Sequence, residues 1–309
     1  MKLIIDTDPG NDDAVALGIA CAARGVDILA VTSVPGNADI EKTTTNTLEI
    51  LQIFGRYDIP VYRGASKAIM TWQNYSSSMY RRISSSWFGN DGLCDSVKID
   101  PKRDQLRGGN AIDAINILTS SLPGQITFIA LGPLTNLALA MRFNPDLSKQ
   151  LKEVIIMGGA VSSKNSPEFN FASDPIAAHI VIKELTCKKY LFPFEVSGEE
   201  YYTPTPIVRE YFSSGTVKSR FMKAIMHGFE KIHGSLSVSF FDAVAVASTL
   251  QRNAITKMSH VHVTVGVNPD KSAGTCMILD ADAKGNKNVY LVEEIDYMVY
   301  RNMFLSSVL

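Results

Sequence analysis

The 309-residue sequence contains only four cysteines, and they lie far apart, at Cys21, Cys94, Cys187 and Cys276. No two of them have the CxxC spacing of a zinc knuckle or a thioredoxin-like redox site. Four isolated cysteines are typical of reduced, mostly buried thiols in a cytosolic protein. We therefore expect no zinc site of this kind, and a chain this long needs no disulfide to support its core.

The sequence also lacks an excess of charge and long apolar runs. Its formal net charge is −1 and no long run of Lys or Arg occurs, which argues against a nucleic-acid partner because phosphate backbones require clustered positive charge. No stretch approaches the ~20 apolar residues that span a bilayer, and the apolar run Leu3-Ile4-Ile5 is too short for a signal peptide. We expect a cytoplasmic protein with no membrane partner and a small neutral or polar ligand.

What the sequence does contain is a regular alternation of short β-type runs and helical patterns. Strands are predicted at 3–5, 26–34, 126–131, 154–157 and 190–192, and helices at 14–23, 41–54, 111–118, 134–141 and 175–185. This alternation predicts an α/β fold with a mostly parallel central sheet and helices on both faces. Ligands of such sheets bind at the carboxyl ends of the strands.

The C-terminal third is predicted to be more helical. Helices are expected at 204–212, 217–232 and 242–250, and short strands at 260–266, 276–279 and 289–292, where antiparallel pairing is plausible. No linker of low complexity, repeat or charge block divides the chain, so a single domain is expected over residues 1–309. The Ser-rich stretch 76–86 is interleaved with aromatic and Arg residues, which favours a functional loop or flap.

The most informative feature is a group of four carboxylates, Asp6, Asp8, Asp12 and Asp13, directly after the first predicted strand. A Pro-Gly pair between them predicts a sharp turn that crowds the acids in one loop. Like charges at this density repel, so a cation is expected among them, and hard oxygen ligands suit calcium or magnesium. The alternative is a solvated acidic turn in which Asp12 caps the following helix.

Two other acidic-loop motifs are excluded by single residues. An EF-hand loop beginning at Asp6 requires Glu at its twelfth position, which is Leu17 in this sequence. A haloacid-dehalogenase-type phosphatase also opens with a strand and Asp-x-Asp, but it carries Thr or Val two residues after the second Asp. Gly10 occupies that position here.

The segment from Asp6 to Ala14 reads DTDPGNDDA, and with it the sequence resembles the inosine–uridine nucleoside hydrolase family. Further blocks follow in the family's order: PGN at 35–37, LGPLTN at 131–136, MGG at 157–159, EFN at 168–170, DP at 174–175 and FDAVAVA at 241–247. The resemblance covers most of the chain. It implies a calcium-dependent enzyme that hydrolyses the N-glycosidic bond of ribonucleosides to free base and ribose.

The resemblance also implies roles for individual residues. Asp8 would bind calcium and, as general base, accept a proton from the attacking water. The other calcium ligands would be Asp13, the backbone carbonyl of Leu131, and Asp242. Ribose hydroxyls would be held by a set of polar side chains: Asp12, Asn37, Asn165, Glu168 and Asn170. These residue types suit the chemistry, because the sugar develops positive oxocarbenium character as the C–N bond breaks.

At two positions the sequence departs from the family pattern. Phe241 stands where many members have a His that protonates the departing base, and Phe88 replaces another frequent His. In one interpretation Trp87, Phe88 and Phe241 stack on a purine, as in the purine-preferring branch of the family. In another, His233 is the acid, because imidazole titrates near neutral pH. Plain core packing of the aromatic rings is the third interpretation.

Two other functions remain open at this stage. A nucleoside- or ribose-binding protein with impaired catalysis would explain the two His replacements, although pure binding does not require Asp8. A metal-dependent phosphohydrolase would use the same acidic loop, but the sequence has no Gly-rich phosphate cradle of the Walker type. The family resemblance further implies a homodimer or homotetramer and a role in purine salvage.

Overall fold

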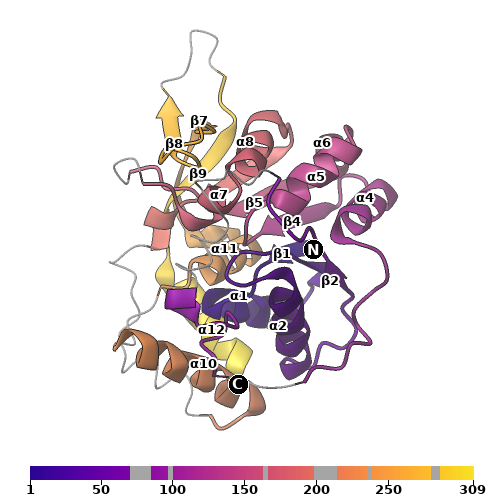
Figure 1. Cartoon of the computed structure of the whole chain (residues 1–309), viewed down its shortest axis with the longest axis vertical. Coiled ribbons are helices and arrows are strands. Elements are labelled where there is room, and N and C mark those ends of the chain that lie inside the picture. Colours follow the sequence, from indigo (N-terminus) through magenta and orange to yellow (C-terminus); the bar gives the residue numbers. More distant parts are fainter. Residues whose placement is uncertain (70–84, 97–99, 163–165, 198–213, 235–238, 280–285) are drawn as a thin grey trace.

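A computed structural model describes residues 1–69, 85–96, 100–162, 166–197, 214–234, 239–279 and 286–309 (Figure 1). Its centre is a nine-stranded sheet with the strand order β3-β2-β1-β4-β5-β6-β9-β7-β8. Among the described residues, no helix combines the length and apolar character needed to cross a membrane. The predicted α/β fold is confirmed.

The larger part of the sheet is parallel. It contains β1 (Lys2–Thr7), β2 (Asp27–Ser33), β3 (Val61–Arg63), β4 (Ile126–Ala130), β5 (Leu151–Met157) and β6 (Lys188–Phe192). β9 (Val289–Ile295) continues this part parallel to β6. Beyond it, β7 (Ile255–Val265) and β8 (Cys276–Leu279) pair antiparallel, as predicted for the C-terminal third.

Two hydrophobic clusters show that helices cover both faces of the sheet. Successive residues of β1 alternate between them: Leu3 and Ile5 belong to one cluster and Ile4 to the other, as the two-residue period of a strand requires. The first cluster lies under helices that occupy the lower half of Figure 1: α1 (Asn11–Ala22), α2 (Ile40–Ile53), α10 (Val217–His233), α11 (Phe241–Leu250) and α12 (Tyr297–Val308). The second lies under α4 (Ala111–Ser121), α5 (Thr135–Phe143), α6 (Leu147–Gln150) and α8 (Pro175–Glu184).

Parallel strands bring several loops together at one edge of the sheet, where their carboxyl ends lie. The acidic loop, a name we use for residues 8–13 although 11–13 already form the first turn of α1, follows β1. The segment 34–39 follows β2, and the segment 131–134 follows β4. After β5 the chain reaches α7 (Phe169–Ser173), and after β6 it forms the 3-10 helix η1 (Phe194–Ser197). This edge is where an α/β sheet is expected to bind its ligand.

Two buried side chains from the predicted motifs hold this edge together. The Nδ2 of Asn136 donates to Asp6 Oδ1 (2.7 Å) and to the carbonyl of Ser33 (2.9 Å), and its Oδ1 accepts from the backbone N–H of Ala65 (2.9 Å). It therefore links segments at the ends of β1, β2 and β3. Asp174 caps α8 and accepts from Thr135 Oγ1 (2.7 Å), which joins α8 to the start of α5.

The structure adds elements that the sequence pattern did not predict. These are the short strand β3, the one-turn helix α6, the helix α7 around Glu168, the two 3-10 helices η1 and η3 (Arg252–Ala254), and the last helix α12. β7 begins at Ile255, five residues before its predicted start. The predicted helix 204–212 lies outside the described residues, as does most of the predicted flap at 76–86.

Lys189 on β6 generates a prediction for stability. Its Nζ donates to the carbonyls of Ile182 (2.6 Å) and Leu185 (2.5 Å) at the end of α8, and burial lowers the pKa of Lys189 to about 8. Lys189→Met removes the donor from these buried carbonyls, so the free energy of unfolding should fall by about 1–3 kcal/mol in urea denaturation at pH 7. The exposed neighbour Lys188 provides the control, and Lys188→Met should leave the free energy of unfolding unchanged. Equal stability of the two variants would contradict the stabilising role of the Lys189 hydrogen bonds.

Candidate active site

Asp8 lies just beyond β1, and the backbone of two glycines closely surrounds its carboxylate. The backbone N–H of Asn37 donates to Asp8 Oδ2 (2.8 Å), and Asp8 is only 1% exposed. A Cβ at Gly36 would lie 2.0 Å from Asp8 Oδ2, and a Cβ at Gly132 would lie 2.3 Å from Asp8 Oδ1. Glycine is therefore required at both positions, because any side chain would displace the carboxylate.

Three carboxylates meet beside Asp8. Oxygens of Asp12, Asp13 and Asp242 all lie within 4.8 Å of one another. Asp12 and Asp13 belong to the first turn of α1 and Asp242 to the first turn of α11, so two helix N-termini face the cluster. Asp8 is not in this group of three, although the charges of its neighbours reach it.

The pKa values show how unfavourable the crowding is without a cation. Burial is the first cause in every case, and it raises the pKa of all four carboxyls. The charge of Asp13 is the next cause for Asp8 and Asp12, and the charge of Asp12 is the next for Asp242. The pKa of Asp12 reaches about 7.

The donor set fits a hard divalent cation. The clustered ligand atoms are all carboxylate oxygens, with no sulfur or imidazole nitrogen among them, which is the choice of Ca²⁺ and Mg²⁺. Asp13 is oriented by Thr7 Oγ1, which donates to its Oδ1, and by the backbone N–H of Gly10 (2.9 Å). Capping of α1 by Asp12, the alternative interpretation, is not observed, because the N-cap position is Gly10.

Asp6 stands apart from the other three acids of the motif. Thr32 Oγ1 (2.5 Å) and Asn136 Nδ2 (2.7 Å) both donate to its Oδ1, and its Oδ2 has no hydrogen-bond partner among the described residues. Burial raises the pKa of Asp6 to about 7. These contacts make it a buried support for the strand ends, which the spacing of the motif alone did not reveal.

A cavity of about 380 Å³ opens beside the acid cluster. This size suits a small organic ligand. Its polar lining residues, which we call the polar wall, are Asp12, Asn37, Glu168, Asn170 and Asp242, and Leu131 lies among them. Its apolar and mostly aromatic lining residues, which we call the aromatic wall, are Trp87, Phe88, Met157, Phe169, Phe194 and Phe241. The cavity thus offers both hydrogen-bonding groups and aromatic rings to one ligand.

The polar wall is held in place by main-chain hydrogen bonds. Glu168 caps α7, and its carboxylate accepts from the backbone N–H groups of Asn170 (2.8 Å), Phe171 (3.2 Å) and Gly159 (2.8 Å). Asn170 Nδ2 donates to the Leu131 carbonyl (2.7 Å). The segment interpreted as either a surface loop or a binding segment is therefore a short buried helix facing the cavity.

Two rings of the aromatic wall stack on each other. Phe241 packs on Phe194 with ring centroids 4.8 Å apart and an interplanar angle of 22°. Phe88 lies at the end of a helical turn beside Trp87, whose side chain is 51% exposed. The predicted base-facing residues Trp87, Phe88 and Phe241 thus share one cavity with the predicted ribose-facing ones.

His233 does not line the cavity, in contrast to the other predicted base contacts. Its Nε2 donates to the Trp87 carbonyl (2.9 Å). The centroid of its ring lies 4.8 Å from that of Trp87 and 4.2 Å from that of Phe229. His233 therefore packs against Trp87 without entering the cavity. Asn165, the remaining predicted ribose contact, lies outside the described residues.

Sequence reasoning missed several residues of the cavity wall. Phe194 follows β6 in a stretch without a motif, and only the strand-end rule for parallel sheets points to it. Met157 and Ala160 flank the Gly158-Gly159 pair of a predicted block, whose glycines have φ of +155° and +75°. A Cβ at Gly158 would lie 2.7 Å from the Phe171 ring, so the absence of a side chain at Gly158 lets this block pack directly on α7.

Comparison with known proteins identifies the family. A model of the family described as inosine–uridine preferring nucleoside hydrolase matches residues 3–302. The chain belongs to this family. The predicted family and the predicted class of enzyme, a nucleoside hydrolase, are thereby confirmed.

Individual relatives agree with this membership. The chain is 30% identical to the pyrimidine-specific ribonucleoside hydrolase RihB of Escherichia coli O157:H7, over 86% of this chain and 83% of that protein. It is 37% identical to an uncharacterised protein of Schizosaccharomyces pombe, over 59% of this chain and 57% of that protein. Among solved structures, the purine-preferring ribonucleoside hydrolase from Gardnerella vaginalis has the same fold, with a TM-score of 0.89 at 21% identity, over 100% of this chain and 98% of that one.

The raised pKa values of the acid cluster predict how stability depends on pH. These carboxyls bind protons more tightly in the folded protein than in the unfolded chain, where the ordinary value is 3.8. With metal chelated, the stability they contribute is present below about pH 4 and is lost as the pH rises through about 7, the pKa of Asp12. The melting temperature of the chelated protein should therefore fall from pH 5.5 to pH 8.

Calcium should prevent this fall in melting temperature at high pH, since a bound cation favours the ionised carboxylates. Differential scanning calorimetry should show a larger rise in melting temperature on adding Ca²⁺ at pH 8 than at pH 5.5. The variant Asp13→Asn should lose most of the Ca²⁺ response at both pH values. An equal Ca²⁺ response in this variant and the parent contradicts the cluster as the binding site.

Proposed function

We propose that this protein hydrolyses the N-glycosidic bond of ribonucleosides, with Ca²⁺ held by the acid cluster and Asp8 as general base. The observation that carries the proposal is that one cavity of about 380 Å³ is lined both by polar side chains, which include Asp12 and Asp242 of the acid cluster, and by aromatic rings. A ribonucleoside needs both kinds of contact, because it has a hydroxylated sugar at one end and a planar base at the other. The whole chain, residues 1–309, acts as one nucleoside-hydrolase-like domain in this proposal.

At the polar wall, each side chain has an atom suited to a sugar hydroxyl. Because Asn170 Nδ2 already donates to the Leu131 carbonyl, its Oδ1 is the atom that accepts a hydroxyl hydrogen. Glu168 is oriented by three backbone N–H groups, and Asp12 and Asn37 face the same cavity. We assign ribose binding to these four residues and to Asn165. Carboxylate and amide oxygens also stabilise the positive charge that the sugar ring develops.

Asp8, Asp13, the Leu131 carbonyl and Asp242 would hold the Ca²⁺. When bound, the ion supplies a Lewis acid that makes a neighbouring water easier to deprotonate. Asp8 is fixed by the Asn37 N–H and enclosed by Gly36 and Gly132, so its carboxylate is aligned to accept that proton.

Departure of the base must proceed without an imidazole in the cavity. None of the described lining residues is His, Lys or Arg. We propose that Phe241 and Phe88 stack on the base, aided by Trp87, and that stacking makes a purine ring basic enough to take its proton from solvent. A purine offers the larger ring system for such stacking, so purine nucleosides are the preferred substrates. His233 contributes by supporting Trp87.

The two alternative functions have less support. A metal-dependent phosphohydrolase would take positive charge from the bound cation, but the described lining residues add no Lys, Arg or His to hold the phosphate. A nucleoside-binding protein without catalysis has no need for a general base. We further propose that the protein works in the cytoplasm as a homodimer or homotetramer, in purine salvage.

Asp8→Asn tests the general base. The amide fits the same glycine-enclosed pocket but cannot accept the proton, so kcat for release of hypoxanthine from inosine should fall by at least about 10³-fold, at the upper end of the range for general-base catalysis. The melting temperature in Ca²⁺ should stay within a few degrees of the parent. Asp27→Asn, at an exposed ion pair with Lys2, is the control and should keep full activity. A kcat for Asp8→Asn close to the parent value excludes the assignment.

Phe241→Ala tests the stacking role. Loss of the ring should reduce kcat/KM for inosine about 10- to 100-fold, more than for uridine, while the inhibition constant of free ribose stays within about twofold. Phe143→Ala removes a ring that is 77% exposed and does not line the cavity, and it should have no effect. If inosine and uridine lose activity equally, stacking on purines is not the role of Phe241.

A further inference from the structure

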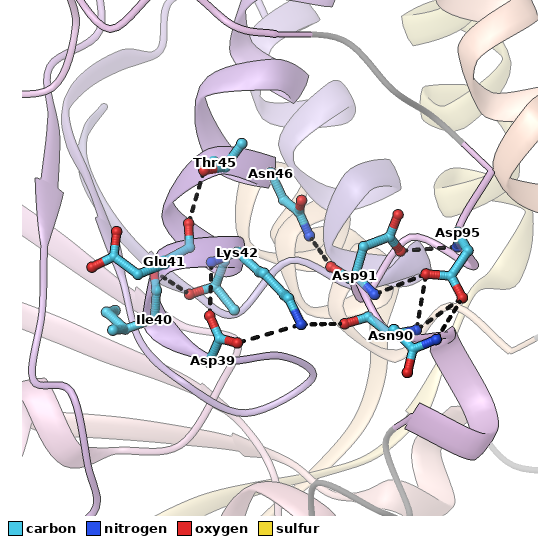
Figure 2. A network of polar contacts seen from close by, with 10 residues as sticks. Asp39, Ile40, Glu41, Lys42, Thr45, Asn46, Asn90, Asp91 and Asp95 are labelled. Atoms are coloured by element: carbon cyan, nitrogen blue, oxygen red, sulfur yellow. Dashed lines mark hydrogen bonds and ion pairs between the residues drawn. The ribbon is translucent and has the colours of Figure 1, made fainter.

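The loop that carries Phe88 into the cavity is fastened to α2. We call residues 88–96 the base-side loop. The carbonyl of Asn90 accepts from Lys42 Nζ (2.8 Å), and that ammonium also contacts Asp39 Oδ2 (3.4 Å). One turn further along α2, Asn46 Nδ2 donates to the carbonyl of Asp91 (2.8 Å) (Figure 2).

Within the loop, two carboxylates organise the backbone. Asp95 accepts from the backbone N–H groups of Asn90 (3.0 Å) and Asp91 (3.1 Å), and Asp91 Oδ1 accepts from that of Asp95 (2.9 Å) (Figure 2). Asp91 Oδ1 also accepts from the backbone N–H of Leu93 (2.7 Å). The N–H of Cys94 closes the loop onto the carbonyl of Phe88 (2.7 Å). Cys94 and Asp95 both have positive φ, at 60° and 50°. Such conformations are uncommon outside glycine and persist only where surrounding contacts fix them.

The same asparagine also reaches the acidic loop. Asn46 Nδ2 donates to the carbonyl of Pro9 (3.2 Å), the residue next to Asp8, and Asn46 is only 5% exposed. The two loops approach so closely that a Cβ at Gly92 would lie 3.0 Å from the Pro9 carbonyl oxygen. One buried amide thus contacts both the loop of the general base and the loop of the aromatic wall.

We propose that Asn46 is a positioning residue that fixes the base-side loop against the acidic loop, and so sets the distance between base recognition and the reacting sugar. The inference rests on the function proposed above for the two loops. Lys42 acts differently, because it holds the base-side loop alone and has no contact with Pro9. Replacing Lys42 therefore tests the support of the base-side loop alone, whereas replacing Asn46 tests the connection between the two loops.

Three variants in the Ca²⁺-loaded protein test the proposal. Asn46→Ala removes the hydrogen bonds to the carbonyls of Pro9 and Asp91. Lys42→Met removes only the hydrogen bond to the Asn90 carbonyl in the base-side loop. Thr45→Ala is the control, because the Thr45 hydroxyl donates within α2 to the Glu41 carbonyl (2.8 Å) (Figure 2). Hydrogen exchange is followed in peptides covering residues 5–13 and 88–96. kcat and KM are measured with inosine.

Asn46→Ala should speed exchange in both peptides, raise KM about tenfold and lower kcat several-fold, as expected for the loss of a hydrogen bond that aligns two parts of a site. Lys42→Met should speed exchange in 88–96 alone and raise KM with kcat unchanged. Thr45→Ala should match the parent in every measurement.

The proposal is overturned if exchange in Asn46→Ala changes in only one of the two loops. It is also overturned if that variant melts at a lower temperature but keeps the parent's kcat and KM, which is the result for a purely structural residue. If the parent protein releases no base from inosine or uridine in Ca²⁺, the proposed function is wrong. The exchange pattern still decides whether Asn46 couples the two loops.

Discussion

Mutual repulsion among buried carboxylates is the constraint on which the rest of this structure depends. Asp8, Asp12, Asp13 and Asp242 lie together with little exposure to water, and burial raises the pKa of each. A fold that keeps four acids in this arrangement pays a cost in stability unless a cation compensates it. The two helix N-termini that face the cluster offset part of the repulsion.

The surrounding architecture keeps the acids in place. Asn136 joins the ends of the first three strands, and glycines at 36 and 132 leave room for the Asp8 carboxylate and for nothing larger. Asn46 connects the acidic loop to the base-side loop, which carries Phe88 of the aromatic wall, by donating to the carbonyls of Pro9 and Asp91. Buried amides recur in these roles because one side-chain NH₂ group can donate to two oxygen acceptors from different segments.

Much of the fold could be predicted from the sequence because its elements have strong periodic patterns. The strand and the helix around the acidic motif form as expected, but β1 includes Asp6 and α1 begins at Asn11, so Asp12 and Asp13 lie in its first turn and not in the predicted loop. The motif residues Asp12, Asn37, Glu168, Asn170 and Asp242 do line one cavity. What could not be predicted depends on contacts across the fold. β3 is three residues long, and α12 has no N-terminal motif beyond Asp296. His233 faces the back of Trp87 and not the cavity, a difference set by how α10 packs.

The claim that a cation belongs among these acids is tested most directly by titrating Ca²⁺ into the chelated protein at pH 7 in a calorimeter, in two buffers of different ionisation enthalpy. The account predicts one ion per chain and release of protons on binding, since carboxyls with raised pKa values must give up their protons to the metal. Binding should be lost when Asp242 is replaced by Asn. Absence of binding, or binding that survives this replacement with no proton released, contradicts the account.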